Sequence, residues 1–241
     1  MYTFDSRVRY SETDESGKLG ITGIMNYLQD CSTFQSEDLG LGIDYLKSRN
    51  RAWWLNAWQI EVDRYPRLGE EIVVGTWAYG FKGIYGLRDF SITDRSGNDL
   101  VRADSRWFFY DTKNGCPVRV TEDDIRGYCP EDRKLSMSGT TGKIKLPEYM
   151  EEKPSVRVER HHLDTNFHVN NAQYVELARE YLPENFTIRR LRAEYKKAAV
   201  LGDEMVPAVA ACGGDFIISL RDGEKNSFAN LWFGGEDGKN D

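Results

Sequence analysis

Hydrophobic positions in the first half of the chain follow a helical period and then a strand period. Those that recur every three or four residues, as on one face of an α-helix, are Ile21, Ile24, Met25, Leu28, Cys31 and Leu39. We therefore expect a long helix there, with Thr22 as its N-cap and Gly40 as its C-terminal stop. Beyond this helix, the pattern predicts strands over about residues 53–64, 70–82, 84–94 and 100–111.

The second half predicts the same order of elements with a shorter helix. Asn170 or Asn171 is placed to cap a helix over residues 170–182, which Pro183 ends; its apolar residues are Tyr174, Leu177, Ala178 and Tyr181. Strands are predicted over about residues 187–197, 204–212, 215–221 and 227–233, with hairpin turns at 94–97 and 222–223. A helix followed by antiparallel strands in each half is an α+β architecture.

A diverged internal repeat explains why the two halves share this order. Three pairs of segments match in sequence and in order: Val8-Arg9-Tyr10 through Asp14 with Val158-Glu159-Arg160 through Asp164, Leu68-Gly69-Glu70-Glu71 with Leu201-Gly202-Asp203-Glu204, and Arg106-Trp107-Phe108 with Leu231-Trp232-Phe233. The repeat predicts two related domains, residues 1–129 and 149–241. The Ser-, Gly- and Thr-rich segment 130–148 reads as a linker, and a disordered tail is expected from about residue 234.

Charge and cysteine spacing exclude several classes of protein. The net charge of −7 argues against binding to nucleic acid or to an anionic membrane, because both require a cationic surface. The chain shows neither a secretory signal nor about 18 continuous apolar residues, so we expect a cytoplasmic location and no membrane partner. The even number of cysteines would allow disulfides, but without a signal peptide reduced thiols are favoured. The four cysteines form no CxxC pair, which argues against a structural zinc site.

Polar side chains crowd into the segment that precedes the second predicted helix. Asp164, Asn166 and His168 alternate, so an extended loop would project all three to one side. The backbone amides at the start of a helix lack internal partners and can hold negative charge on an oxygen, which makes Val169, Asn170 and Asn171 candidates for binding substrate or an oxyanion. A carboxylate, an amide and an imidazole near such amides suit attack of water on a carbonyl group.

The equivalent loop of the first half is an internal control. It retains Asp14 but has Ser16 in place of Asn166 and Lys18 in place of His168. A purely structural role would leave the two loops alike, so the difference favours chemistry in the second half. The alternatives are a buried, satisfied histidine at 168 and an aspartate that braces its loop, since Asp14 persists without a histidine.

Other catalytic readings of this region are weaker. Adjacent histidines on a strand point to opposite faces, so His161 and His162 are not expected to share a metal with Asp164 and His168. Glu176 on the predicted helix is expected to be a solvated surface residue. No Gly-x-Ser-x-Gly motif is present and no cysteine lies in the loop, which argues against a covalent intermediate.

The motif Asp164-x-Asn166-x-His168-Val-Asn-Asn-x-x-Tyr174 resembles the second hotdog domain of plant and bacterial acyl-ACP thioesterases. The resemblance extends from about residue 4 to 233 and includes Arg9-Tyr10-Ser11-Glu12-Thr13-Asp14, Asn26-Tyr27-Leu28-Gln29-Asp30-Cys31-Ser32 and Glu194-Tyr195-Lys196-Lys197. It implies two tandem hotdog domains, an acyl-binding tunnel in the first, and catalysis by Asp164, Asn166 and His168. It also implies acyl carrier protein as partner and hydrolysis without a metal or organic cofactor.

The chain departs from the family pattern in one place. Family members commonly carry an acidic residue shortly after the Tyr-Lys-Lys run, thought to help activate water, where this chain has Ala198 and Ala199. This departure leaves three alternatives. Asp164 or His168 acts as the general base to a greater extent, the enzyme is less active, or its substrate differs from that of other family members.

A basic run in this acidic chain suggests where a carrier protein binds. Arg189, Arg190, Arg192, Lys196 and Lys197 form either a solvated strand face or a docking surface for the acidic carrier. Three rival functions remain, which are an acyl-CoA thioesterase of the same fold, a non-catalytic acyl- or carrier-binding protein, and a hotdog dehydratase, whose acid–base histidine motif is not found. Two hotdog domains can pair within one chain, so the protein is expected to be a monomer or a homodimer.

Overall fold

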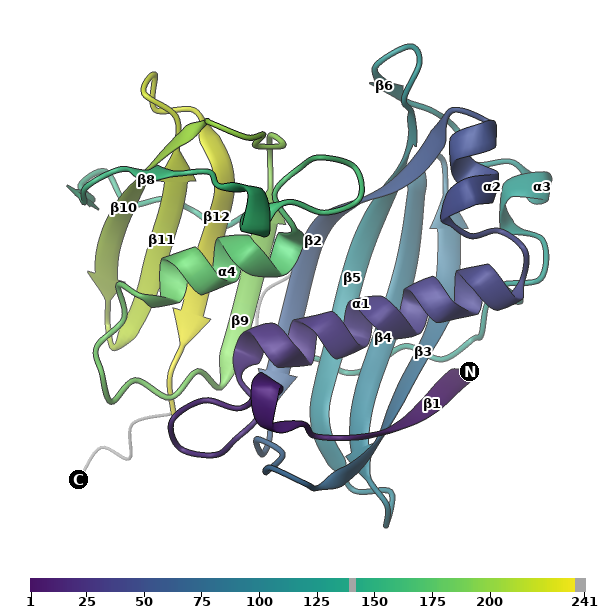
Figure 1. Cartoon of the computed structure of the whole chain (residues 1–241), viewed down its shortest axis with the longest axis horizontal. Coiled ribbons are helices and arrows are strands. Elements are labelled where there is room, and N and C mark those ends of the chain that lie inside the picture. Colours follow the sequence, from purple (N-terminus) through teal and green to yellow (C-terminus); the bar gives the residue numbers. More distant parts are fainter. Residues whose placement is uncertain (139–141, 237–241) are drawn as a thin grey trace. The chain divides into compact units, whose positions relative to one another are not determined.

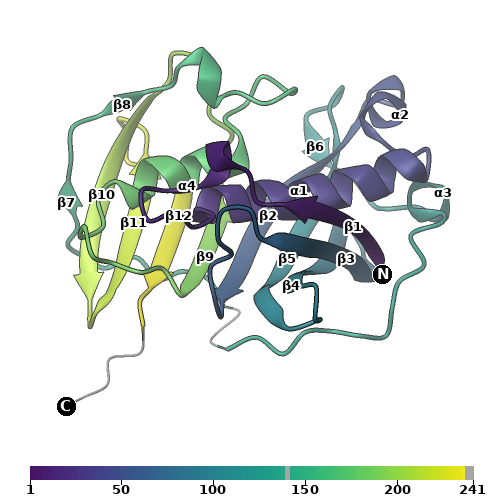
Figure 2. The ribbon, with the colours of Figure 1, turned by 60° about the horizontal axis from the view of Figure 1, so that its bottom comes forward.

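The computed structural model describes residues 1–138 and 142–236, and the chain divides into two compact units. The first unit comprises Met1–Asn56 and Ile60–Ser138, and the second comprises Ala57–Gln59 and Gly139–Asp241. Each unit contains an antiparallel sheet with one principal helix on a face of the sheet (Figures 1 and 2). Of the helices in residues 1–138 and 142–236, none has the length and apolar character needed to cross a membrane.

The first unit begins with an edge strand and a long helix. Its larger elements are β1 (Tyr2–Arg7), α1 (Ile21–Asp38), α2 (Ile43–Ser48), β2 (Arg51–Val62), β3 (Glu71–Lys82), β4 (Tyr85–Asp94) and β5 (Asp99–Asp111). Three short elements complete it: the 3-10 helix η1 (Tyr10–Glu12), β6 (Cys116–Pro117), which pairs with β5, and α3 (Glu122–Ile125). The strand order is β1-β3-β4-β5-β2, and α1 lies across one face (Figure 1).

The core of the first unit lies between α1 and this sheet. Five of the six residues predicted to form the apolar face of the helix are buried, with Ile24, Leu28 and Cys31 fully inaccessible. The sixth, Leu39, is half-buried and follows the last helical residue, Asp38. Opposite them, the register aligns Val74 of β3 with Ile92 of β4 and Val101 of β5, and these three side chains are also inaccessible. Burial of several such aliphatic side chains, at about 1.5–3 kcal/mol each, holds the helix on the sheet.

The helix boundaries correct part of the sequence prediction. The N-cap is Gly20 rather than Thr22, which lies inside the first turn of α1. Gly40 does follow the end of the helix and has a φ of +66°, a conformation that glycine adopts without steric strain.

The second unit repeats the arrangement with a helix half as long. Its elements are β7 (Glu151–Glu152), β8 (Val156–Arg157), the 3-10 helix η2 (Arg160–His162), α4 (Asn171–Arg179), β9 (Arg190–Tyr195), β10 (Glu204–Cys212), β11 (Asp215–Arg221) and β12 (Ser227–Gly234). The strand order is β9-β12-β11-β10-β7, with β8 paired to β10. The helix α4 contacts β11 and β12 and ends at Arg179, so Tyr181 lies outside it, contrary to the predicted end at residue 182.

The hairpin turns predicted at 94–97 and 222–223 are built on aspartates. The Asp94 carboxylate accepts hydrogen bonds from the amides of Ser96 (2.8 Å) and Asn98 (2.9 Å). The Asp222 carboxylate does the same for Glu224 (3.0 Å) and Asn226 (2.9 Å). Local bonding of this kind fixes the turns independently of the sheet.

The segment 130–148, expected to be a linker, is hydrogen-bonded along much of its described length. In the first unit, the Glu131 amide donates to the Ala78 carbonyl (2.9 Å) and the Leu135 amide donates to the Asp89 carboxylate (2.6 Å). In the second unit, the Ile144 amide donates to the Glu194 carboxylate (2.8 Å). Residues 139–141 lie outside the described residues, as do residues 237–241 of the expected tail, while Gly234 still belongs to β12.

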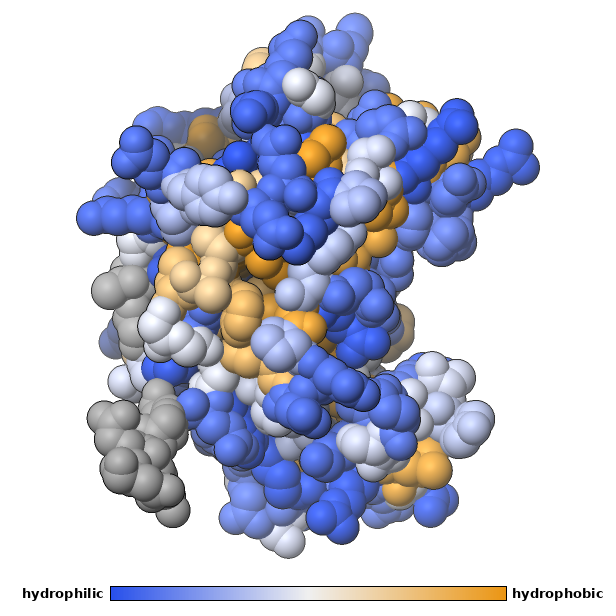
Figure 3. Space-filling view, turned by 90° about the vertical axis from the view of Figure 1, so that its left-hand side faces the viewer, coloured by the Kyte–Doolittle hydropathy of each residue, from blue (hydrophilic) through white to orange (hydrophobic). Residues whose placement is uncertain are grey.

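Hydrophobic side chains also gather on the side of the second sheet that faces away from α4. Ile144 and Met150 of the connecting segment pack there with Ala208 of β10 and Ile217 of β11. Figure 3, seen from the β10 side of Figure 1, shows a largely polar face around a central hydrophobic area. The connecting segment therefore contributes to the core of the second unit.

Candidate active site

The loop between η2 and α4 is a tight hairpin held by backbone hydrogen bonds. The Asp164 amide donates to the His168 carbonyl (2.7 Å), and the Phe167 amide donates to the Asp164 carbonyl (3.1 Å). Leu163 and Val169 form an antiparallel bridge at its base. The prediction of an extended loop with alternating side chains is therefore wrong, because the chain reverses at Phe167, which has a φ of +61°.

Asp164 braces this hairpin with its own side chain. Its Oδ1 accepts hydrogen bonds from the amides of Asn166 (2.7 Å) and His168 (3.3 Å). Oδ2 takes no part in these two bonds. The structural reading of Asp164 is thus supported, and any chemical role comes in addition to the bracing.

The loop of the first unit has the same hydrogen bonds. Asp14 Oδ1 accepts from the amides of Ser16 (2.9 Å) and Lys18 (3.1 Å), and the Asp14 amide donates to the Lys18 carbonyl (2.8 Å). Gly17, with a φ of +71°, stands where Phe167 stands in the second unit. The two loops thus share one backbone conformation and differ in the side chains that it presents.

The segment after β9 runs beside the second-unit loop. The Val169 amide donates to the Ala199 carbonyl (2.9 Å), and His168 forms an antiparallel bridge with Val200. Ala198 is exposed and Ala199 is buried. The two alanines, which the resemblance predicts to stand in place of an acidic residue, therefore lie in the segment that pairs with half-buried His168.

Asn170 caps α4, and this leaves fewer amides for an oxyanion than the sequence suggested. The Asn170 Oδ1 accepts a hydrogen bond from the Ala172 amide (2.9 Å). The Asn170 amide itself donates to the His162 carbonyl (2.8 Å), and the Val169 amide is bonded to Ala199 as described above. An oxyanion at either of these two amides would have to replace an existing hydrogen bond, so the side chains of the loop are the better candidates.

Two tyrosines to which the sequence assigns no separate role, buried Tyr174 and partly buried Tyr195, connect the helix to the adjacent segment. The Tyr174 hydroxyl accepts from the Ala199 amide (3.0 Å), while the Tyr195 hydroxyl donates to the Asn171 carbonyl (2.9 Å). Their rings lie 5.6 Å apart in an edge-to-face arrangement. Burial raises the pKa of Tyr174 to about 12 and raises that of Tyr195 as well, so both stay neutral and serve to position the loop. Both belong to motifs that carried the resemblance, which was the available signal.

The neighbouring histidines lie on a 3-10 helix rather than on the strand assumed from sequence. The rings of His161 and His162 are 4.0 Å apart, and buried His162 accepts a hydrogen bond at Nδ1 from the Glu159 amide (2.9 Å). Burial, together with nearby His161, lowers the pKa of His162. In residues 1–138 and 142–236 no group of three or more His, Cys, Asp or Glu side chains is arranged to hold a metal. Glu176 forms an ion pair with Arg179 on α4 (3.2 Å).

The five basic candidates for carrier docking all have partners within the protein. Arg189 bonds to Glu236 (Nε–Oε1 3.1 Å) and Lys197 to Asp222 (3.1 Å), while the remaining contacts join Lys196 to Glu194, Arg192 to the Gly142 carbonyl and Arg190 to the ring of Trp232. Desolvation lowers the pKa of Arg192. Their positive charge is therefore partly compensated.

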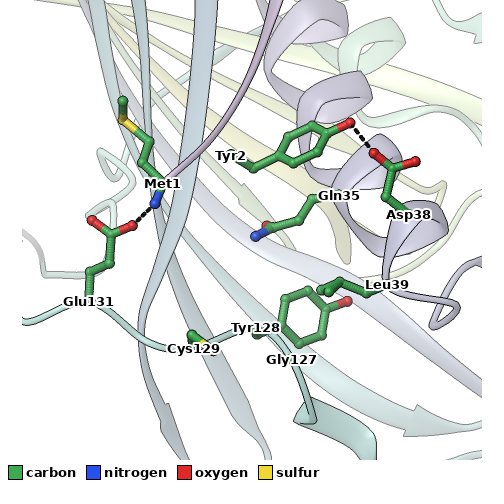
Figure 4. Close-up of a pocket in the computed structure, with 9 residues that line it drawn as sticks. All are labelled: Met1, Tyr2, Gln35, Asp38, Leu39, Gly127, Tyr128, Cys129 and Glu131. Carbon is green, nitrogen blue, oxygen red and sulfur yellow. Dashed lines mark hydrogen bonds and ion pairs between the residues drawn. The ribbon is translucent and has the colours of Figure 1, made fainter.

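A separate pocket of about 380 Å³ lies in the first unit (Figure 4). Its wall is made by the start of β1, the end of α1 and residues 127–131, and Tyr2 donates a hydrogen bond to Asp38 across it (2.7 Å). Behind two of the lining residues, Gln35 and Tyr128, lies the buried guanidinium of Arg88, which donates to the Gln35 side chain (2.5 Å). The nine residues drawn belong neither to the 164–168 loop nor to β9.

Each half of the chain matches a known family model. A family model described as the acyl-ACP thioesterase N-terminal domain matches residues 1–128, and one described as the acyl-ACP thioesterase C-terminal domain matches residues 146–228. A chloroplastic dodecanoyl-[acyl-carrier-protein] hydrolase of Cinnamomum camphora is 24% identical over 86% of this chain and 58% of its own length. Oleoyl-acyl carrier protein thioesterase 1 of Arabidopsis thaliana is 25% identical over 73% and 53%. The chain thus spans little more than half the length of these two relatives.

Solved structures show the same fold. An acyl-ACP thioesterase from Bacteroides thetaiotaomicron superposes with a TM-score of 0.86 at 22% identity, covering 97% of both chains. The 12:0-ACP thioesterase of Umbellularia californica gives 0.83 at 21% identity, covering 96% of both. Similarity at this level of identity establishes the fold, and it confirms the α+β, hotdog-type architecture predicted from the sequence.

Proposed function

The chain belongs to the acyl-ACP thioesterase family, and on that premise we propose that it hydrolyses the thioester of fatty acyl-ACP to a free fatty acid and holo-ACP. Models of both domains of the family match in the expected order. The observation that carries the proposal is the pair of loops. They share a backbone conformation, and only the second presents Asn166 and His168.

The chemistry required is the attack of water on the thioester carbonyl. In the proposed mechanism the His168 imidazole takes a proton from the attacking water, since histidine is a common general base near neutral pH. The new C–O bond forms, the C–S bond breaks, and the thiolate leaving group receives from the His168 imidazolium the proton that the imidazole took from water. Asn166 donates a hydrogen bond to the developing oxyanion from its side-chain amide. Asp164 holds the loop through Oδ1. In the proposal its negative charge also stabilises the imidazolium that forms.

We assign acyl-chain binding to the first unit. Its sheet presents an apolar face under α1, with Val74, Ile92 and Val101 in register. Buried Arg88 interrupts this face toward the end of α1 that carries Gln35. The acyl chain would lie along the apolar part, where a length difference of one methylene is worth about 1–3 kcal/mol.

The proposed place of action is the cytoplasm. This location agrees with the state of the cysteines in the chain. Cys31, Cys116, Cys129 and Cys212 are all unpaired. Unpaired cysteines are typical of proteins in a reducing compartment.

One observation favours a second candidate, a non-catalytic acyl- or carrier-binding protein. The segment beside His168 carries Ala198 and Ala199 where family members commonly have an acid. Release of fatty acid from matched acyl-ACP and acyl-CoA esters of several chain lengths separates the functions. Release that favours the ACP esters supports the proposal, and faster release from CoA esters makes the protein an acyl-CoA thioesterase. Acyl binding without release from any ester makes it a binding protein.

A further inference from the structure

Phe167 occupies a position in which neither packing nor backbone geometry favours phenylalanine. It lies in the turn of the 164–168 loop, where its amide donates to the Asp164 carbonyl, with a φ of +61° and 77% of its surface exposed. A bulky residue in this left-handed conformation is destabilising relative to glycine, and an exposed ring recovers little of that free energy by burial. At the equivalent position the first unit has Gly17.

Two further hydrophobic side chains lie beside this loop. Val200 is 43% exposed and Leu201 is 50% exposed. They begin a turn in which the Val200 amide donates to the Asp203 carboxylate (2.9 Å), and Val200 pairs with His168. We refer to Phe167, Val200 and Leu201 as the loop-tip patch.

The positions equivalent to the loop-tip patch can be compared in the first unit, whose loop has no histidine. There the bridge between Lys18 and Arg67 corresponds to the bridge between His168 and Val200. The counterparts of the loop-tip patch are therefore Gly17, Arg67 and Leu68. Two of the three positions are hydrophobic only in the unit that contains His168, so the fold itself does not require them.

The surroundings of the patch indicate what binds to it. Lys196 and Lys197 precede it on the same segment with exposed side chains. Lys196 pairs with buried Glu194, whereas Lys197 pairs with partly exposed Asp222, so that the Lys197 ammonium group stays accessible to a partner. A second copy of this chain would bring lysines against lysines. An acidic protein with some apolar surface would meet complementary charge, which accelerates encounter, and an aromatic anchor of the kind that contributes most to binding energy.

We propose that the loop-tip patch is a contact surface for the acidic carrier protein that delivers the thioester. The inference rests on the proposed function and deepens it by naming the surface that distinguishes acyl-ACP from acyl-CoA. The thioester is carried on a flexible pantetheine arm of the carrier protein. A side chain that lined only the path of this arm would be more enclosed than Phe167, so we assign the exposed ring to contact with the carrier protein itself.

The test replaces Phe167 by the residue that the first unit uses. In Phe167→Gly we expect the KM for acyl-ACP to rise about tenfold relative to the KM for acyl-CoA of the same chain length, equivalent to about 1.4 kcal/mol. Leu201→Ser should shift the same ratio, and the matched control Leu68→Ser should leave it unchanged. An unchanged ratio in Phe167→Gly with both esters would overturn the proposal, as would an equal rise in both KM values.

A binding measurement separates failure of this inference from failure of the proposed function. Isothermal titration calorimetry of holo-ACP with the 241-residue chain requires no turnover. Loss of binding in Phe167→Gly, with binding retained in Leu68→Ser, supports the contact even if the wild type hydrolyses no acyl-ACP. Equal affinity of wild type and Phe167→Gly for holo-ACP contradicts it even if hydrolysis is fast.

Discussion

Asp14 and Asp164 hold two copies of one loop, 150 residues apart in the sequence. In both, Oδ1 accepts from the amides two and four residues ahead, and the aspartate amide donates to the carbonyl of the latter residue. The duplicated bracing shows that the aspartate is required by the loop in the absence of a histidine. Asp164 alone therefore does not account for chemistry in the second unit, which must also depend on the side chains that differ, Asn166 and His168.

The shared bracing allows the two roles of Asp164 to be separated. Asp164→Ala and Asp14→Ala should each lower the free energy of unfolding by about 1 kcal/mol, since each removes hydrogen bonds to backbone amides. Asp164→Asn retains an acceptor oxygen and should keep most of that stability. Because it removes the negative charge that is proposed to stabilise the imidazolium, it should still lower kcat, by about tenfold. Wild-type kcat in Asp164→Asn would confine Asp164 to bracing.

The conformation at the tip of each loop predicts opposite effects of two substitutions on stability. Phe167→Gly should raise the free energy of unfolding by about 0.5–1 kcal/mol, because glycine adopts a φ of +61° without steric strain. Gly17→Ala should lower it by a similar amount, since alanine is strained at a φ of +71°. Urea denaturation measures both. Destabilisation by Phe167→Gly would mean that the ring packs in a way the structure does not show.

Asp89 predicts an unusual pH dependence of stability. Burial on β4, reinforced by nearby Asp104, raises its pKa to about 7, although the Leu135 amide, Lys134 and Arg133 act in the opposite direction. Its Oδ1 has no hydrogen-bond partner among residues 1–138 and 142–236. Since the folded-state pKa exceeds the unfolded value of 3.8, protonated Asp89 stabilises the fold below about pH 4. That contribution is lost as the pH rises to about 7.

The measurement compares wild type with Asp89→Asn, which cannot ionise at this position. The free energy of unfolding of the wild type, minus that of Asp89→Asn, should decrease steadily between pH 4 and pH 7. Above pH 8 it should be constant. A difference that does not change with pH would show that Asp89 ionises normally in the folded protein.

The alanines beside His168 should respond differently to an introduced acid. Ala198 is exposed and Ala199 is fully buried. Ala198→Glu should therefore change the free energy of unfolding by less than about 0.5 kcal/mol, whereas Ala199→Glu should lower it by several kcal/mol because a charge is buried. Thermal unfolding compares the two. Equal stability of both variants would indicate that position 199 is accessible to water.

Much of the fold was predictable because each element has a local cause. The helical period of Ile21, Ile24 and Leu28 corresponds to buried positions of α1, and the predicted strands agree with the observed ones to within a few residues. The aspartate-based turns separate consecutive strands as expected. The end of α4 was misplaced, because Tyr181 continues the apolar period beyond the last helical residue, Arg179.

The site was predictable in composition and not in geometry. Alternation of Asp164, Asn166 and His168 suggested an extended loop, yet the conformation depends on Phe167 adopting a positive φ, which its residue type does not predict. Some of the basic residues between Arg189 and Lys197 bond to residues distant in sequence, as Arg192 does to the Gly142 carbonyl. The partial compensation of their positive charge could therefore not be deduced from the sequence. The bonding of the amides near α4 depends on tertiary contacts for the same reason.

The most direct test of the account uses the difference between the two loops. Release of fatty acid from acyl-ACP should be measured for wild type, His168→Ala and the matched control Lys18→Ala, with circular dichroism to confirm that all three are folded. Loss of the general base should lower kcat by about 10²–10⁴ in His168→Ala, while Lys18→Ala stays within about twofold of the wild type. Wild-type turnover in folded His168→Ala would contradict the assignment of the active site to the second loop.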